Sequence, residues 1–438
     1  MKRRGLAVIV ISLICVAAAL IPYVFSNTKA AKEAFNSASF SAPPEGETAE
    51  AGKTLAVWIA SVYNLNYPTE TNMSEIGLRS EAVEICDNCV SLGLNTVYLQ
   101  VRPSADALYK SDYFPWSDVL TGVQGNDPGC DPLQIFIEEA KKRDIAVHAW
   151  INPYRVTVGS LKYPKTDTDK LAENNPARIH PEWTVEYAGA LYFNPGIPEV
   201  RRLIIDGAVE IARKYAVSGV HMDDYFYPYP VVSDGETLEF DDSAQYALYG
   251  GGMSLGDWRR ECVNELVKGL YTSLKIVNQE LEFGISPFGV WANNDGVNGG
   301  SDTEASTEGY YDLYADAQAW IDGGYVDYIC PQIYWSTDNQ KTPFKELYDW
   351  WSRAVDGKGV RLLPGIAAYK MNDSSAPGWD RITQVPEQLR YVLDKRNASG
   401  AAFYGYEELT SGNEAAELCA AEIKVWNNEN NSNKKPDD

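Results

Sequence analysis

Two adjacent carboxylates, Asp223 and Asp224, follow the short apolar run 219–222. Carboxylates held this close repel each other when both are ionised, so the pKa of one is expected to rise. A carboxyl group with a raised pKa can donate a proton while its ionised neighbour acts as a base or a nucleophile. The pair therefore predicts acid–base chemistry, with Asp223 as the charged group and Asp224 as the acid. Glu407, near the end of another apolar run, is the second candidate for the acid.

Polar and aromatic side chains gather at the ends of several other apolar runs. Asn and Gln offer a hydrogen-bond donor and an acceptor together, and Tyr and Trp combine a flat apolar face with a polar edge. Both properties suit sugar rings, which have apolar faces and hydroxyl rims. The predicted substrate-binding residues are Arg102, His148, Trp150, Asn152, Arg155, His221, Tyr225, Tyr227, Ser286, Trp291, Gln332, Tyr334, Trp335, Tyr369 and Tyr404.

Three of these candidates have a structural alternative. For His148 and His221, a hydrogen-bonded place in the core explains the sequence as well as substrate binding does. For Asp223 the alternative is a buried salt bridge, with Arg102, Arg155 or His221 as the available partner. We favour a functional role for Asp223 because it ends a run among aromatic residues.

These residues lie on a repeating pattern of apolar runs and amphipathic helical stretches. Eight runs begin at Leu55, Asn95, Ile145, Ser218, Leu281, Val326, Arg361 and Gly400. Helices are expected at Ser74–Leu92, Pro132–Arg143, Pro198–Tyr215, Ser254–Val277, Leu313–Asp322, Pro343–Ala354, Pro386–Lys395 and Glu414–Lys424. Eight strands, each followed by a helix, predict an α/β fold of the (β/α)8 TIM barrel type, with a seven-strand or distorted barrel as the competing count. Active sites of this fold lie at the carboxyl ends of the strands.

Strand alternation predicts which side chains face the inside of the barrel. Val220 and Met222 are expected to face the helices, which leaves His221 and Asp223 inside. The same alternation gives an inward set on two other strands, formed by Gln100, Arg102, His148, Trp150 and Asn152.

The two ends of the chain differ from the barrel in composition. Lys2, Arg3 and Arg4 precede an apolar run over residues 6–25, which predicts a signal peptide or membrane anchor at residues 1–26. Positive charge stays inside, so the rest is expected outside the cytoplasmic membrane. Residues 27–52 are predicted to be a flexible linker, 53–425 the barrel and 426–438 a disordered tail.

Charge and residue counts exclude several classes of function. A net charge of −23 argues against nucleic acid as a partner. The lone Cys86 and Cys89 pair, read as buried thiols or a helical-turn disulfide, lacks the further ligands that zinc requires. With three histidines and no paired-histidine motif, we expect neither a metal nor another cofactor, and a metal-dependent deacetylase or amidohydrolase is disfavoured.

Several stretches resemble the glycosyl-hydrolase-like 10 family. The stretches are HAWINPYR at 148–155, GVHMDDYFYPYP at 219–230, GISPFGVW at 284–291 and DYICPQIYW at 327–335. The resemblance extends over about residues 54–424. It implies a bacterial (β/α)8 protein outside the cytoplasmic membrane that hydrolyses glycans, with peptidoglycan glycan strands as a substrate class of the family.

Two more distant similarities bear on mechanism. Residues 219–223 resemble strand four of the alpha-amylase clan, which implies a nucleophile at Asp223 with His221 in the place of an arginine. The strand-five acid of that clan is missing, and Ser286 stands near its place. The consecutive acidic pair also resembles the Asp-Glu pair of substrate-assisted hexosaminidases, where the first residue orients the acetamide and the second donates the proton.

The sequence thus predicts an extracytoplasmic glycoside hydrolase acting on a polysaccharide. Its expected partners are that substrate and, through an uncleaved N-terminal segment, the membrane. The alternative is a catalytically inactive glycan-binding barrel, because a fold does not prove activity. The substitution Asp223→Asn separates the two, since only a binding protein would tolerate it.

Overall fold

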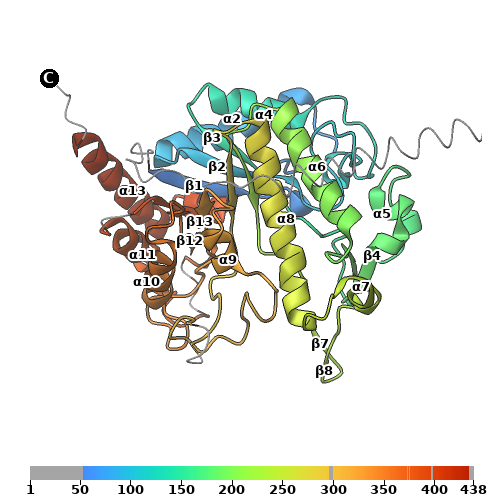
Figure 1. Ribbon diagram of the computed structural model, residues 1–438. Helices are drawn as coiled ribbons and strands as arrows, with labels where there is room; N and C mark the ends of the chain where they lie inside the picture. The colour runs from blue at the N-terminus through green and yellow to red at the C-terminus, as the bar shows by residue number, and fades with distance from the viewer. Residues whose placement is uncertain (1–52, 295–298, 372, 374, 396–397, 434–438) are drawn as a thin grey trace, which may run out of the picture. The chain divides into compact units, whose positions relative to one another are not determined.

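The computed structural model describes residues 53–294, 299–371, 373, 375–395 and 398–433; the predicted export segment and linker lie outside this part of the chain. Nine parallel strands form one sheet in the order β11-β10-β9-β6-β3-β2-β1-β13-β12 (Figure 1). Their bounds are β1 Thr54–Ile59, β2 Thr96–Arg102, β3 Ala146–Ile151, β6 Gly219–Met222, β9 Glu282–Ile285, β10 Tyr328–Ile329, β11 Arg361–Leu362, β12 Gly365–Ala367 and β13 Gly400–Tyr404.

Both edge strands of this sheet, β11 and β12, belong to residues 361–367. Between them, the N–H of Leu363 donates to the carbonyl of Ile329, and the carbonyl of Pro364 accepts from Ala402. One segment therefore pairs with β10 on one side and β13 on the other, and the sheet curls into a barrel. The predicted α/β fold with a parallel sheet is confirmed, and each of the eight predicted runs contains a strand of this sheet.

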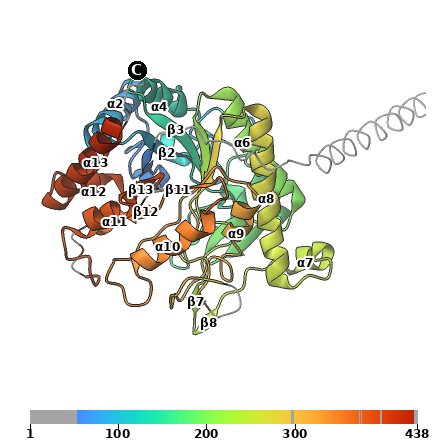
Figure 2. The same cartoon turned by 60° about the vertical axis from the view of Figure 1, so that its left-hand side comes forward.

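Helices surround the sheet (Figures 1 and 2). The main ones are α2 Glu75–Leu92, α4 Pro132–Lys141, α6 Pro198–Lys214, α8 Leu255–Val277, α9 Ala317–Asp322, α10 Phe344–Val355, α11 Gln384–Leu393 and α13 Glu414–Asn433. Several begin where the sequence places a capping side chain: Ser74, Asp131 and Ser254 each accept a backbone N–H of the first turn. Residues 426–433, expected to be a disordered tail, are the last part of α13.

The core has two layers, one between strands and helices and one inside the barrel. Val220 and Met222 belong to the outer layer, as predicted. The inner layer includes Trp58, Tyr98, Trp150 and Tyr328. Strand alternation therefore sorted most of these side chains correctly.

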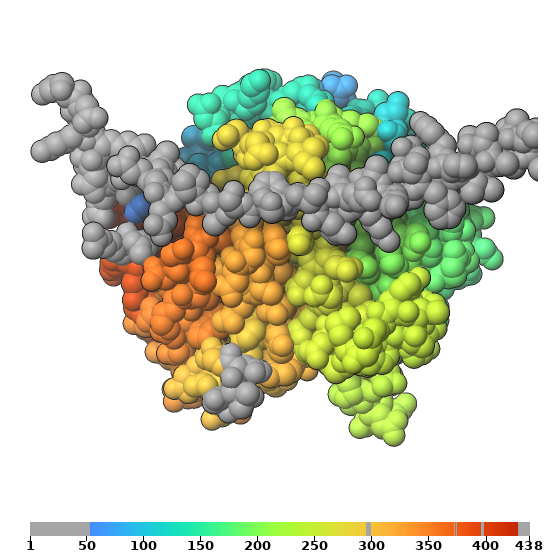
Figure 3. Space-filling model, viewed as in Figure 1, coloured from blue at the N-terminus to red at the C-terminus, as the bar shows by residue number. Residues whose placement is uncertain are grey.

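Long segments follow the carboxyl ends of two strands. After β3 comes the hairpin β4 (Thr184–Tyr187) and β5 (Ala190–Phe193), and after β6 come the hairpin β7 (Val232–Ser233) and β8 (Glu236–Thr237) and helix α7 (Ser243–Tyr249). In Figure 1, and in the same view in Figure 3, the β7–β8 hairpin projects at the lower edge, and Figure 1 shows α7 above it. These segments build up the end of the barrel that carries the predicted site.

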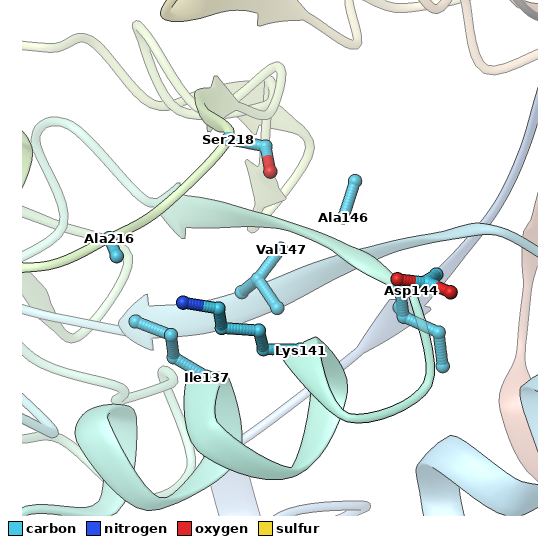
Figure 4. A pocket seen from close by; sticks show the side chains of 8 residues that line it. Ile137, Lys141, Asp144, Ala146, Val147, Ala216 and Ser218 are labelled. Atoms are coloured by element: carbon cyan, nitrogen blue, oxygen red, sulfur yellow. The ribbon is translucent and has the colours of Figure 1, made fainter.

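A hollow of about 390 Å³ lies at the other end of the barrel (Figure 4). Its lining includes Ala146, the first residue of β3, and Ser218, which precedes β6. The side chains of Ile137 and Lys141 approach it from α4. None of the predicted site residues lines this hollow, so the chemistry must be sought at the carboxyl ends of the strands.

Two further observations concern the described residues. No helix among them is both long enough and apolar enough to cross a membrane. Cys86 and Cys89 are free, buried thiols on α2, which agrees with the first of the two readings of that pair.

Candidate active site

Asp223 occupies the first position after β6 and is held by side chains from β3 and the residue that follows it. Trp150 donates its indole N–H to Oδ2 of Asp223 at 3.0 Å, and the Nδ2 amide of Asn152 donates to the same oxygen. The backbone N–H of Tyr225 lies 3.4 Å from Oδ1. Because Asp223 is only 3% exposed, these donors replace the water that a carboxylate would otherwise bind.

A chain of two amides fixes the orientation of Asn152. The backbone N–H groups of Ser61 and Val62 both donate to Oε1 of Gln100 at 3.0 Å. A backbone N–H can only donate, so the other end of Gln100 must be its amide nitrogen, which donates to Oδ1 of Asn152 at 2.6 Å. Asn152 therefore presents its own Nδ2 to Asp223. Residues at the carboxyl ends of β1, β2 and β3 thus together position the carboxylate of Asp223, which follows β6.

Asp224 is equally buried but differently held. Tyr229 donates its hydroxyl to Oδ2 of Asp224, while Oδ1 has no hydrogen-bond partner among the described residues. Gln332 lies close enough to lower the pKa of Asp224, but its Nε2 donates to the carbonyl of Ser286 at 2.9 Å. The free Oδ1 is the position from which a proton could be donated.

Burial is the main influence on the ionisation of both aspartates. It raises the pKa of Asp223 to about 7, with help from the neighbouring Asp224 charge and against the opposing effect of Arg155. Burial also raises the pKa of Asp224, against the hydrogen bond from Tyr229. Two such carboxyls titrate as a unit. Because Trp150 and Asn152 both stabilise charge on Asp223, we place the shared proton on Asp224.

Aromatic side chains surround the pair. Tyr334 and Tyr404 are stacked with ring centroids 6.3 Å apart, and Tyr369 packs edge-on against both at 5.8 Å. The charge of Asp223 raises the pKa of Tyr404 and that of Asp224 raises the pKa of Tyr334, after the larger effect of burial. These predicted binding residues therefore line one wall beside the aspartates.

Further aromatic rings and a cation lie near the aspartates. The guanidinium of Arg155 lies 5.3 Å from the ring centre of Tyr225 and donates to Oδ1 of Asn152 at 3.1 Å. Trp335 packs edge-on against Phe288 at 5.5 Å, and Phe288 packs edge-on against Tyr229. The structure thus brings together most of the residues that the sequence assigned to this end of the barrel.

His221 and His148 lie below the site, as core residues. Trp58 donates its indole N–H to Nε2 of His221 at 3.1 Å, so Nδ1 must carry the proton that it shares with the Tyr328 hydroxyl. Tyr328 in turn contacts Nδ1 of His148 at 2.9 Å. Burial lowers the pKa of His148 to about 3 and holds that of His221 well below its usual range. The structure thus places both histidines in the core, which is the alternative that the sequence left open for them.

Glycines make room for this inner layer. A Cβ on Gly219 would lie 2.6 Å from Nδ1 of His148, and one on Gly284 would lie 2.1 Å from the Tyr328 ring. Ser286 belongs to the same layer, since its Oγ contacts Nε2 of His221 at 3.0 Å and it is 1% exposed. Ser286 is thus a core residue too, although its carbonyl positions Gln332.

Arg102 faces the opposite way from its prediction. The register between β2 and β3 shifts between Gln100 and Arg102, and a bulge of this kind turns the following side chain to the other face. The guanidinium of Arg102 lies 3.8 Å from the ring centre of Phe114, and a Cβ on Gly207 of α6 would come within 3.0 Å of it. Arg102 therefore lies between the sheet and the helices, outside the site.

Two more predicted residues are buried and not available to a substrate, whereas a third, Glu407, is exposed. Tyr227 is 1% exposed and donates its hydroxyl to Asp242 at 3.2 Å. Trp291 is 5% exposed and stacks on Trp350 with centroids 5.7 Å apart. Both stabilise the loops instead. Glu407 is exposed at the rim, where it accepts from Nδ2 of Asn66 at 3.1 Å.

Sequence reasoning missed Tyr229, the direct partner of Asp224. The stretch Tyr225–Pro230 alternates aromatic residues and prolines, and nothing in that pattern separates a tyrosine that points at a carboxylate from one that packs. Trp58 was missed too, although its place in an apolar run at the start of the barrel was clear. No group of three or more His, Cys, Asp or Glu side chains in the described ranges is placed to hold a metal ion.

Comparison with known proteins supports the same chemistry. The model of the family described as glycosyl hydrolase-like 10 matches residues 53–380. Glycosyl hydrolase YngK of Bacillus subtilis (strain 168) is 43% identical over 356 residues, which cover 81% of this chain and 68% of that protein. Glycosyl hydrolase DigH of Escherichia coli (strain K12) is 36% identical over 371 residues, covering 82% and 83% respectively.

A solved structure resembles the fold. The PgaB (BpsB) glycoside hydrolase domain from Bordetella bronchiseptica matches with a TM-score of 0.51 and 12% sequence identity, over 84% of this chain and 98% of that one. At this identity the likeness shows the fold alone.

Proposed function

Because the chain belongs to the glycosyl hydrolase-like 10 family and is a glycoside hydrolase, we propose that it cleaves peptidoglycan glycan strands outside the cytoplasmic membrane. The observation that carries the chemistry is the buried Asp223–Asp224 pair beside a wall of tyrosines. Support for the location comes from the sequence, where three basic residues precede an apolar run over residues 6–25. The site lies at the mouth of what we read as a (β/α)8 barrel, in which β11 and β12 together form the seventh strand.

In the proposed reaction Asp224 is the general acid. Its Oδ1 protonates the glycosidic oxygen as the bond to the anomeric carbon breaks, and the leaving sugar departs as an alcohol. Water then bonds to the anomeric carbon and returns one proton to the aspartate pair, which restores the enzyme. Asp223 carries the negative charge that stabilises the positively charged sugar. Asn152 and Trp150 hold it in place.

Three roles are open to Asp223, and products separate them. As a nucleophile, or as the carboxylate that orients the acetamide of the substrate, Asp223 gives products with retained anomeric configuration. As a general base that activates water it gives inverted products. NMR of the first-formed anomer distinguishes these outcomes. Strands with the acetyl group removed remain substrates only if Asp223 is itself the nucleophile or base.

Digestion of purified glycan strands, with and without stem peptides, followed by mass analysis of the products, tests the function. Asp223→Asn keeps the shape of the side chain and removes its charge, so this variant should fold, bind glycan and lose at least about 100-fold in rate. Asp224→Asn should lose activity similarly, whereas Glu407→Gln should keep it. Wild-type rates in a folded Asp223→Asn protein would make Asp223 a structural residue and end the proposal.

A further inference from the structure

Exposed side chains continue from the site along one part of the barrel's rim. We define the β1–β13 rim as Tyr63 and Asn66, after β1, with Tyr369, after β12, and Glu407, after β13. Tyr63 is 70% exposed and Tyr369 is 41% exposed. The Asn66 amide donates to the Glu407 carboxylate at 3.1 Å. Two exposed aromatic rings and a pair of polar groups thus lie on the loops that follow three neighbouring strands of the sheet.

The backbone presents Tyr63 at a cost in conformational energy. Tyr63 and Asn64 are consecutive residues with φ of 58° and 54°. This left-handed region is unfavourable for a bulky side chain. Asn64 compensates, because its Nδ2 donates to the carbonyls of Pro68 and Val119, each at 2.9 Å. The loop is therefore held rigidly with an exposed ring, and little ordering would accompany binding.

The rim is continuous with the catalytic centre in two ways. Tyr369 packs against Tyr404, whose pKa responds to the charge of Asp223. On the other side, the N–H of Val62 donates to Gln100, the amide that orients Asn152 toward Asp223. A chain bound across the rim would therefore lead directly to the aspartates.

We propose that the β1–β13 rim is a second sugar-binding region, which holds units of the same polysaccharide several residues from the bond that is cut. This inference rests on the proposed function and deepens it. Tyr63 and Tyr369 offer apolar faces for two sugar rings. Asn66 and Glu407 offer acceptors and donors for the hydroxyl groups between them. Glu407, which the sequence suggested as an acid, thereby becomes a binding residue.

The test compares long and short substrates with variants of Tyr63. Tyr63→Asn removes the ring and suits a left-handed backbone, so its melting temperature should equal or exceed that of the wild type. On long glycan strands its kcat/KM should fall about tenfold, mainly through KM, which corresponds to about 1.4 kcal/mol. On glycans of two to four sugars the loss should be less than twofold. Tyr63→Trp should restore most of the activity on long strands.

A matched control is Tyr113→Ala, which removes an exposed tyrosine from a loop whose neighbours Ser111 and Asp112 bond to Glu210 of α6. It should act on long and short glycans as the wild type does. Equal losses for Tyr63→Asn on both substrate lengths, or no loss on either, would overturn the rim proposal while leaving the hydrolase intact. Failure of the wild type to cleave any glycan would instead overturn the proposed function.

Binding gives an independent measurement. In the Asp223→Asn background, affinity electrophoresis in gels containing long glycan should show weaker retardation when Tyr63→Asn is added. Unchanged retardation would also contradict the proposal.

Discussion

Tyr229 donates its hydroxyl to Oδ2 of Asp224, which leaves the other carboxyl oxygen, the buried Oδ1, without a hydrogen-bond partner among the described residues. The loop that carries Tyr229 is itself held by Tyr187 of the β4–β5 hairpin, whose hydroxyl donates to the Tyr229 carbonyl at 3.2 Å and accepts the Val231 N–H at 2.9 Å. An element from the segment after β3 therefore controls the geometry of a carboxyl group after β6.

We expect Tyr229→Phe to lower kcat about tenfold, because a hydrogen bond to a charged group is worth about 1.5–3 kcal/mol. The lost donor normally lowers the pKa of Asp224. Removing it should raise that pKa, so the general acid stays protonated to higher pH and the alkaline limb of the pH–rate profile moves upward. Tyr187→Phe should shift the profile in the same direction by a smaller amount. A profile unchanged in Tyr229→Phe would rule out Asp224 as the acid.

Gln100→Glu tests the amide chain that positions Asp223. Glutamate still accepts the N–H groups of Ser61 and Val62, but it cannot donate to Oδ1 of Asn152. Asn152 should then lose its orientation, and kcat should fall about 10- to 100-fold with a smaller effect on KM. Gln100→Leu would not be a clean variant, because it leaves the two N–H groups unpaired. Steady-state kinetics that match the wild type would show that Asn152 needs no such support.

Arg102→Met tests the placement of a buried cation. None of the three guanidinium nitrogens of Arg102 has a hydrogen-bond partner within the described ranges, and burial lowers its pKa. Replacing such a charge by an apolar side chain of similar length is often neutral or stabilising. We expect the free energy of unfolding to rise by about 1 kcal/mol or stay level, and kcat/KM on glycan to stay within twofold. A large loss of glycan binding in this variant would show that Arg102 belongs to the substrate-binding site.

The free energy of unfolding at acid pH should depend on two groups of buried residues that have opposite effects. The pKa of His148 is lowered to about 3 and that of His221 lies well below its usual range. Their contribution to stability is therefore complete above about pH 6.5 and is lost as pH falls toward 3. The aspartate pair acts the other way. Burial raises the pKa of Asp223 to about 7 and also raises that of Asp224, so the folded state binds more protons than the unfolded state, and stability is gained as pH falls from 7 toward 4.

Asp223→Asn removes one of the two carboxyls that give this gain, together with its charge beside Asp224. Between pH 6.5 and 4, its free energy of unfolding should fall more steeply than that of the wild type, by up to about 1.4 kcal/mol per pH unit. Urea titrations at pH 7, 5.5 and 4 measure the difference. Parallel curves for the two proteins would mean that Asp223 is not buried with a raised pKa.

The strands of the sheet and the main helices followed from periodicity because each was local, whereas the two hairpins and α7 were not predicted. The runs and helices at Leu55, Ser74 and Pro132 all begin within two residues of their predicted starts. Asp223 could be aimed inward for the same reason, since Val220 and Met222 claim the outer face. Alternation predicts on which face of the sheet a side chain lies, provided that the strand has no bulge.

The remaining errors arise where a bulge interrupts the alternation, or where the position of a side chain depends on more than the face of a strand. At Arg102 the bulge after Gln100 reverses the count. His148 and Trp150 share the inner face, but only Trp150 reaches Asp223. Alternation predicts the face of the sheet and not the position of a side chain along the barrel axis, so it could not separate these two residues. Trp291 lies outside any strand of the sheet, where its burial depends on Trp350 from a distant helix.

The first and last described segments meet at the same end of the barrel. Lys53, just before β1, lies with its ammonium 5.1 Å from the ring centre of Trp426, and Asn427 donates to the carbonyl of Gly93 before β2 at 3.0 Å. Both therefore sit at the amino ends of the strands, opposite Asp223. A bead, a sensor chip or a domain joined directly at Lys53 would consequently be attached at the end of the barrel opposite the two aspartates.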